Sequence, residues 1–368
     1  MALSKINNDS FDDTAVHGRR NLIINGAMQV AQRGTSFTGH GAGVNYGIDR
    51  FADYHNSDGA FTISQETSVV PDDFTHALKI QTTTADSSIA AGQRLIVFTR
   101  CEGNVVSQLN WGTSAAKTVT LSFYVRSSIT GTHGGAFGNG ADNRNYPFTY
   151  TINSADTWER KTITVAGDTS GTWATDTGRS LQVVWGLGVG STYSGTAGAW
   201  ASGDKNSATG ATTGVLGTLN ATWYLTGVQL EVGDKATPFE HRSEAEELSL
   251  CQRYFHMIKA VTTYSPIGVG RAWSTSRTSS CYYLPRPMRA NPTISINDAS
   301  YFEVAGVGGS PNAIYNDGAV GSFSGGSSSV HGVKIGLGSS STPFTTGTIY
   351  QIESNNSTNM EISLAAEL

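Results

Sequence analysis

Apolar and polar side chains alternate along most of the chain after Asn21. The alternation is clearest in residues 119–125, 148–152 and 181–189. A period of two is typical of a β-strand that buries one face. In residues 223–232 the phase slips at Gly227, which predicts a β-bulge. Because eight or more such segments precede residue 240 without a helical period, we predict an antiparallel β-sandwich of jelly-roll type.

One short segment has the period of a helix. Ser243 and Glu246 have the spacing of a capping box, and Leu248, Cys251 and Phe255 recur on one helical face. We therefore predict a helix over 243–255. Alternation resumes after it, at 293–296, 301–304, 333–337 and 360–364. The predicted organisation is a polar segment 1–20, a jelly-roll β-sandwich 21–241, a connecting helix region 242–257 and a second, smaller β domain 258–368.

Long stretches rich in Gly, Ser and Thr separate the predicted strands. Residues 131–145, 167–178 and 191–217 are too long for hairpin turns, so we predict loops there. Residues 306–315 and 318–329 have the same composition in the second domain. Long loops on a β scaffold are common places for binding surfaces.

Composition narrows the classes of partner. The chain of 368 residues contains 43 Gly, is 38% hydrophobic and only 14% charged, and has a net charge of -5. We expect no nucleic-acid partner, because the sequence holds no basic stripe to neutralise phosphates. No run approaches the roughly 20 apolar residues that cross a bilayer, so we expect no membrane insertion. The segment 1–20 is too polar to form a core and is expected to dock on another protein.

The sequence offers little conventional catalytic chemistry. Nucleophile-elbow, zinc-protease, P-loop and EF-hand motifs are absent from it, so we expect no enzyme, cofactor or metal. Cys101, Cys251 and Cys281 are odd in number, widely spaced and form no Cys-x-x-Cys pair, so they are interpreted as reduced, buried thiols. His133, in a predicted loop, is interpreted as solvated, and Asp72-Asp73 as a turn with too few oxygens to bind calcium alone. Paired carboxylates that meet only in space stay open as an alternative.

Aromatic residues are the more informative signal. Seven Trp and fourteen Tyr are many for a weakly apolar chain. An exposed ring can stack on the C–H face of a sugar, whereas neighbouring polar groups bond its hydroxyls. Trp185 and Trp223 lie on the apolar faces of alternating segments and are interpreted as core residues. The aromatic residues of the predicted loops are either sugar platforms or lids folded onto the sandwich: Trp173, Tyr193 and Trp200.

Several stretches together resemble a module of tailed-phage and prophage fibre proteins, which is itself similar to carbohydrate-binding jelly rolls. The matching residues are 21–34, 49–51, Trp158, 161–165, 171–173, 190–200, 224–240 and 250–255. Residues 285–292, Pro-Arg-Pro-Met-Arg-Ala-Asn-Pro, are similar to a sequence that such proteins often contain after this module. The closing motif, 224–240, is long enough to be specific.

The resemblance implies a virion protein, often trimeric, that is assembled in the host cytoplasm and is not an enzyme. It implies attachment to host surface polysaccharide or lipopolysaccharide, with residues 1–20 held by other virion tail proteins. Because Trp173 and Trp200 lie in stretches of sequence that match the module, we expect them to have a role common to the module and not to bind one host's receptor. The less familiar domain 258–368 is then the hypothesised receptor-binding tip.

Five aromatic residues of that tip are the candidate sugar platforms: Trp273, Tyr282, Tyr283, Tyr301 and Tyr315. Alternation directs one of Tyr282 and Tyr283 into the core. Two other functions stay open. One is a purely structural head, neck or collar appendage, and the other is a polysaccharide depolymerase.

Overall fold

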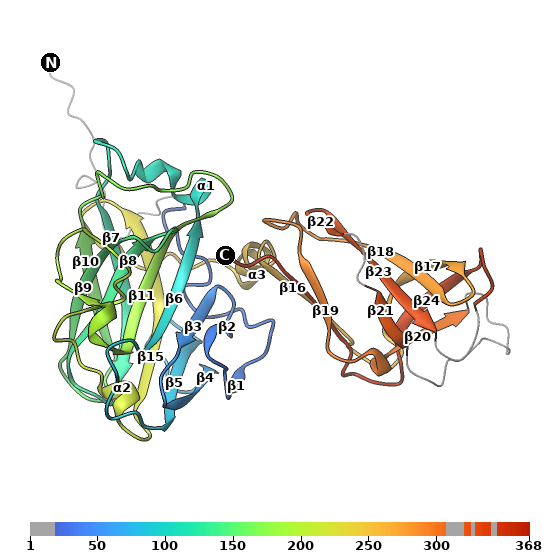
Figure 1. Cartoon of the computed structure of the whole chain (residues 1–368), viewed down its shortest axis with the longest axis horizontal. Helices are drawn as coiled ribbons and strands as arrows, with labels where there is room; N and C mark the ends of the chain where they lie inside the picture. Colours follow the sequence, from blue (N-terminus) through green and yellow to red (C-terminus); the bar gives the residue numbers. More distant parts are fainter. Residues whose placement is uncertain (1–18, 307–319, 325–327, 340–343) are drawn as a thin grey trace, which may run out of the picture. The chain divides into compact units, whose positions relative to one another are not determined.

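The computed structural model describes residues 19–306, 320–324, 328–339 and 344–368. The chain divides into two compact units, of which one runs to Leu248 and also includes Leu368, and the other spans residues 249–367. Both units are built of β-strands (Figure 1), and the prediction of an all-β fold is confirmed. No helix among the described residues is long and apolar enough to cross a membrane.

The first unit is a sandwich of two antiparallel sheets. In spatial order the first sheet contains β1 Ser36–Thr38, β4 Ala60–Glu66, β5 Ala77–Thr84, β15 Thr222–Val232, β7 Val119–Ser127 and β10 Glu159–Val165. The second contains β13 Ala201–Ser202, β9 Arg144–Ile152, β8 Gly131–Asn139, β11 Arg179–Val189, β6 Arg94–Glu102, β3 Phe51–His55 and β2 Gly43–Tyr46. The short strands β12 Ser194–Gly195 and β14 Ser207–Ala208 form a parallel pair.

The core of this unit lies between the two sheets. Phe123 of β7, Trp185 of β11 and Trp223 of β15 are fully buried in one apolar cluster. The rings of Phe123 and Trp185 meet edge to face at 5.7 Å. Burial of a large apolar side chain contributes roughly 1.5–3 kcal/mol, so the alternating strands predicted from the sequence are what hold the sandwich together.

The predicted bulge is present in β15. The pairing of β15 with β7 shifts between Thr226 and Gln229, and Gly227 has a φ of 60°. A Cβ atom at Gly227 would lie 2.7 Å from the Phe74 ring and 2.8 Å from that of Tyr124. Glycine is therefore required both by the backbone conformation and by the approach of the rings.

The predicted loop 131–145 is wrong. It forms β8 and the start of β9, which pair antiparallel, so that His133 lies opposite Tyr150. The interpretation of His133 as solvated is wrong for the same reason, since its side chain is fully buried. Its ring stacks on Tyr150 at 5.4 Å, and its Nε2 lies 2.9 Å from the carbonyl of Ile129. Burial lowers the pKa of His133.

The other predicted loops of this unit are confirmed in part. Residues 167–178 contain neither helix nor strand. The stretch 191–217 holds only short elements, namely η3 Ser191–Tyr193, the strands β12 to β14 and α2 Gly214–Gly217. Two further short helices, α1 Gly103–Val106 and η2 Ser107–Leu109, follow β6.

The predicted helix is shorter than expected. It forms α3 Glu244–Cys251 instead of 243–255. The Ser243 hydroxyl accepts a hydrogen bond from the Glu246 backbone N–H at 3.3 Å, which confirms the N-terminal cap. The last predicted turn is lost because Phe255 pairs with Ala365 and begins the strand β16 Phe255–Lys259.

The second unit contains two antiparallel sheets among its described residues. One has the order β16 Phe255–Lys259, β25 Glu361–Ala365 and β19 Thr293–Ile296. The other has the order β20 Phe302–Gly306, β24 Ile349–Ser354, β17 Pro266–Ser274, β18 Arg277–Tyr283, β23 Gly332–Ser339 and β21 Val320–Ser324. The short strand β22 Ser328–Ser329 pairs with β23, and η4 Ala299–Tyr301 precedes β20.

The second unit has an apolar core of its own. Phe302, Leu337 and Ile362 belong to one buried cluster drawn from both of its sheets. Cys101 and Cys251 of the chain are buried, but Cys281 on β18 is exposed, so the interpretation of all three as buried thiols is wrong. The segment 1–20, predicted to attach to the virion, lies outside the described residues except for Arg19 and Arg20.

Candidate functional site

The sheet that contains β17, β18 and β23 has one face on the core and one face in water. Ala272, Thr278 and Ile335 point to the core and are buried. The residues between them point outward, and two of these are large aromatics: Trp273 is 51% exposed and Tyr283 is 82% exposed. We call the outer face of these three strands the outer strip, defined by Arg271, Trp273, Arg277, Tyr283 and Lys334.

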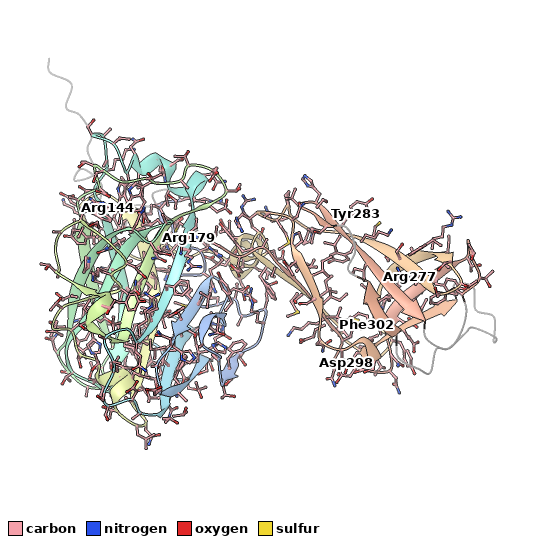
Figure 2. All side chains as sticks on the ribbon, viewed as in Figure 1. Arg144, Arg179, Arg277, Tyr283, Asp298 and Phe302 are labelled. Atoms are coloured by element: carbon pink, nitrogen blue, oxygen red, sulfur yellow. The ribbon has the colours of Figure 1, made fainter. Side chains whose placement is uncertain are left out.

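The two aromatic residues of the outer strip lie far apart along it. Tyr283 and Arg277 are at opposite ends of β18 (Figure 2), six residues and therefore about 20 Å apart. Trp273 lies at Arg277's end, because the Arg277 guanidinium carbon is 5.6 Å from the centre of its ring. The strip can therefore contact an extended ligand at two separate rings.

Tyr282 points the other way, as the alternation predicts. It packs against the apolar core, where its ring stacks on His256 at 5.9 Å. Its hydroxyl lies 3.2 Å from the His256 Nε2 atom. Burial raises the pKa of Tyr282 and lowers that of His256. This ring is therefore a packing residue of the second unit.

A shallow pocket of about 280 Å³ opens at Tyr283's end of the outer strip. It is lined by Cys281, Tyr282, Tyr283, Ser328, Ser329, His331, Gly332, Val333 and Lys334. Lys334 lies directly opposite Cys281 in the pairing of β18 with β23. An exposed phenol ring beside two hydroxyls, an imidazole and an ammonium group offers both a stacking surface and hydrogen-bond donors.

The remaining candidates of the second domain do not join the outer strip. Tyr301 is half-buried in η4 and packs against the apolar core, next to a strand that is separated from β17 by β24. Tyr315 lies outside the described residues. The structure thus brings Trp273 and Tyr283 to one face and leaves Tyr282 and Tyr301 on the core side.

The loop tryptophans of the first unit fold onto the sandwich. The ring of Trp111 lies 4.8 Å from that of Trp173 and 5.2 Å from that of Trp200, both edge to face. The Trp173 indole N–H donates to the Ser170 carbonyl at 3.2 Å, and that of Trp200 to the Ala166 carbonyl at 2.8 Å. Their rings and N–H groups are occupied, which favours the interpretation of these residues as lids.

An ion pair fixes the loop that carries Trp173. Arg144 on β9 donates two hydrogen bonds to the Asp168 carboxylate, at 2.8 Å and 2.6 Å. Burial opposes ionisation of Asp168, but these bonds outweigh it and lower its pKa. A small cavity of about 110 Å³ remains beside Trp111 and Trp173.

Tyr193 is also engaged within its own unit. The guanidinium carbon of Arg94 lies 3.8 Å from the centre of the Tyr193 ring and 4.5 Å from that of Tyr54. Arg94 in turn pairs with Asp204 at 2.7 Å. One face of Tyr193 is therefore covered by a cation–π contact, which leaves it a weaker platform than Trp273 or Tyr283.

Two features of the structure were missed by reasoning from the sequence. The cations of the outer strip are one of them, although Arg271 stands only two residues before Trp273, which was a readable signal. The second feature is an open hollow of about 670 Å³ in the first unit, lined by Asp73, Phe74, Tyr124, Arg160, Pro238, Phe239 and His241. Its rings come from distant segments, which no spacing in the sequence connects.

A carboxylate pair lies on the same sheet, on the two strands β24 and β20 that follow β17 in spatial order. Glu303 on β20 and Glu353 on β24 are directly opposite each other, with exposed fractions of 4% and 7%. Burial and the neighbouring Glu353 raise the pKa of Glu303 to about 7. Such a pair has the residue types of a glycosidase, but its burial leaves little access for a polysaccharide. Among the described residues, no group of three His, Cys, Asp or Glu side chains is placed to hold a metal ion.

Known proteins are similar to this chain in structure but not in sequence. No family model and no curated protein matches the sequence. Solved structures that match include a putative sugar-binding protein from Bacteroides thetaiotaomicron, at 12% identity and a TM-score of 0.33 over 58% of this chain and 100% of that one. The family 11 carbohydrate-binding module of Clostridium thermocellum, in complex with a tetrasaccharide, matches at 8% identity and a TM-score of 0.27 over 56% of this chain and 98% of that one.

The enzymatically active domain of tailspike protein 4 from bacteriophage CBA120 also matches. Its identity is 10% and its TM-score is 0.32, over 58% of this chain and only 21% of that one. The chain is thus similar in structure to carbohydrate-binding modules and to part of a phage tailspike domain. At these identities the likeness concerns the β-sandwich fold alone.

Proposed function

We propose that this chain is a phage fibre protein that attaches the virion to a host surface glycan by non-covalent binding, through the outer strip of its second unit. The observation that carries the proposal is the exposure of Trp273 and Tyr283 on one face of paired strands. Trp is highly buried on average, and aromatic and arginine side chains are enriched at binding hot spots, so these two rings beside exposed cations on one strand face support a binding surface.

The chemistry of the outer strip suits a sugar chain. Two rings carried by strand positions about 20 Å apart can stack on separate sugar residues of one polymer. Arg271, Arg277 and Lys334 are exposed between and beside the rings and carry N–H donors for hydroxyl or acidic groups. The flat, open surface suits a polysaccharide better than a small molecule, which would need a deeper cavity.

Placement in a virion rests on the resemblance of residues 21–256 and 285–292 to phage fibre modules. In this proposal residues 1–20 join the chain to other tail proteins and three chains form a homotrimer. Weak contacts to single sugars would then act together, because neighbouring copies raise the effective concentration of the strip. Light scattering should give the mass of a trimer, and a stable monomer at micromolar concentration would contradict this part.

The test compares binding of the labelled full chain and of a Trp273→Ala/Tyr283→Ala variant to bacterial cells and to their purified polysaccharides. We expect the variant to bind about tenfold or more weakly, as for the loss of central aromatic contacts. Tyr264→Ala is a matched control, because Tyr264 is 46% exposed in the same unit but outside the strip. Undiminished binding by the double variant would refute the proposal.

The same samples separate the alternatives. Incubation with the bound polysaccharide should release no reducing ends, since we propose that the chain binds the glycan without cleaving it. Release that is abolished by Glu303→Gln would favour a depolymerase. If the full chain adsorbed to no cell and no polysaccharide, a purely structural appendage would replace glycan attachment.

A further inference from the structure

The central strands of the second unit contain basic residues and no acidic ones. From Pro266 to Asn297 the sequence has Arg271, Arg277, Arg286 and Arg289 and neither Asp nor Glu. The strand β23 adds Lys334, again without an acidic residue. This is unexpected in a chain whose net charge is -5. The outer strip is therefore a local positive surface on an acidic protein.

The cations of the outer strip are not used to hold the fold. Arg271, Arg277 and Lys334 are exposed, and none of them forms an ion pair within the part of the chain that the structure describes. Elsewhere the pattern is different: Arg94 pairs with Asp204 at 2.7 Å and Lys259 with Glu361 at 3.0 Å. A cation without a structural partner is available to a ligand.

The three cations lie close enough to act on one ligand. Arg271 is opposite Ser279 and Lys334 is opposite Cys281, with β18 between their strands. With strands roughly 4.8 Å apart and residues roughly 3.4 Å apart along them, the two backbones are about 12 Å from each other. This is comparable to the Debye length of about 10 Å at 0.1 M salt, so their fields overlap. Arg277 adds a third charge beside Trp273.

We infer that the ligand of the outer strip is an anionic polysaccharide, whose carboxylate or phosphate groups pair with Arg271, Arg277 and Lys334 while its sugar rings stack on Trp273 and Tyr283. This inference rests on the proposed function and names its ligand class. The guanidinium fork of arginine matches the geometry of both acidic groups. A neutral glycan would leave the three charges without partners and would gain nothing from their clustering.

Single-stranded nucleic acid also combines negative charge with stacking rings, so the test must exclude it. The observations favour a glycan, because successive bases of a nucleic acid would need closely spaced platforms. The strand positions that carry the two rings here are about 20 Å apart. A single-stranded oligonucleotide is therefore included as a competing probe.

The experiment measures the affinity of the full chain for two matched pairs of polysaccharides. Polygalacturonate is compared with its fully methyl-esterified form, and phosphomannan with dephosphorylated mannan. We expect the acidic member of at least one pair to bind about tenfold more tightly, and this preference to vanish between about 50 mM and about 500 mM salt. The pair that shows the preference identifies the acidic group as carboxylate or phosphate.

The variant Arg271→Gln/Lys334→Gln should lose the preference and bind the acidic member about tenfold more weakly. The control variant Arg19→Gln/Lys259→Gln removes the same number of positive charges at exposed positions outside the strip. It should keep the preference for the acidic polysaccharide. Equal binding of both members in both pairs, equal weakening by the two variants, or equal binding of the oligonucleotide would overturn the inference.

Failure of the inference can be told apart from failure of the proposed function. If the acidic and neutral members bind equally but Trp273→Ala/Tyr283→Ala still abolishes binding, the strip binds glycans and only the ligand class is wrong. If neither pair binds but the full chain still adsorbs to bacterial cells, only the ligand class is wrong, whereas a chain that adsorbs to no cell and to no polysaccharide contradicts both statements. Melting curves of the strip variants should match that of the unchanged chain, since their substituted side chains are exposed, and the control variant, which removes two surface ion pairs, should lose no more than about 1 kcal/mol for each.

Discussion

Replacement of Trp200 by alanine separates a tryptophan that holds the fold from one that binds a ligand. The Trp200 ring lies 5.2 Å from Trp111, 5.6 Å from Trp173 and 5.4 Å from Tyr146. Its N–H donates to the Ala166 carbonyl at 2.8 Å. Trp200→Ala should therefore destabilise the first unit and leave glycan binding unchanged.

The size of the effect follows from these contacts. Each aromatic pair is worth about 0.5–1.5 kcal/mol beyond burial, and the lost hydrogen bond about 1 kcal/mol. Because Trp200 is only half-buried, we expect about 3 kcal/mol, the lower end of the range for Trp→Ala in a core. For a unit of this size that lowers the melting temperature by about 6–12 °C.

The assay is differential scanning calorimetry together with polysaccharide binding, and Trp273→Ala is the matched variant. Trp273 is 51% exposed and its ring contacts the Arg277 guanidinium. Its removal should change stability by less than about 1 kcal/mol but should weaken binding. The reverse result, with normal stability and lost binding for Trp200→Ala, would refute the assignment of Trp200 as a lid and move the ligand site to the first unit.

Three further predictions concern stability. Gly227→Ala should cost about 1–3 kcal/mol because of the positive φ and the ring beside it, lowering the urea midpoint of the first unit. Burial and Glu353 raise the pKa of Glu303 from its ordinary 4.5 to about 7, so the second unit should lose stability as the pH rises between those values. Glu303→Gln should flatten this dependence in melting curves at several pH values. Asp168→Asn should cost about 2 kcal/mol at pH 7 by breaking the pair with Arg144, and its difference from the unchanged chain should shrink as the pH falls below the ordinary 3.8.

Alternation predicted the strands whose two faces differ strongly in polarity. The strands β7 and β11 were readable because every second residue is large and apolar, and these residues fill the core. The strand β8 was missed because Gly134, Gly135 and Gly138 resemble a loop. A Cβ at Gly135 would lie 2.4 Å from the Val184 carbonyl oxygen. Those glycines serve close packing, which only the three-dimensional neighbours reveal.

At the candidate site, too, the sequence predicted local features but not contacts between distant residues. Alternation separated Tyr282 from Tyr283, but whether a loop ring folds down depends on distant partners such as Trp111 for Trp173 and Trp200. The end of α3 was misjudged because the pairing of Phe255 with Ala365 joins residues far apart in the sequence. Local propensity cannot anticipate such pairings.

The most direct test of glycan attachment by the outer strip is hydroxyl-radical footprinting of the full chain, with and without a bound polysaccharide, read residue by residue by mass spectrometry. We expect the polysaccharide to protect Trp273 and Tyr283, whereas Trp173 and Trp200 should keep the same reactivity in both states. Protection of the loop tryptophans, with Trp273 and Tyr283 unchanged, would contradict it.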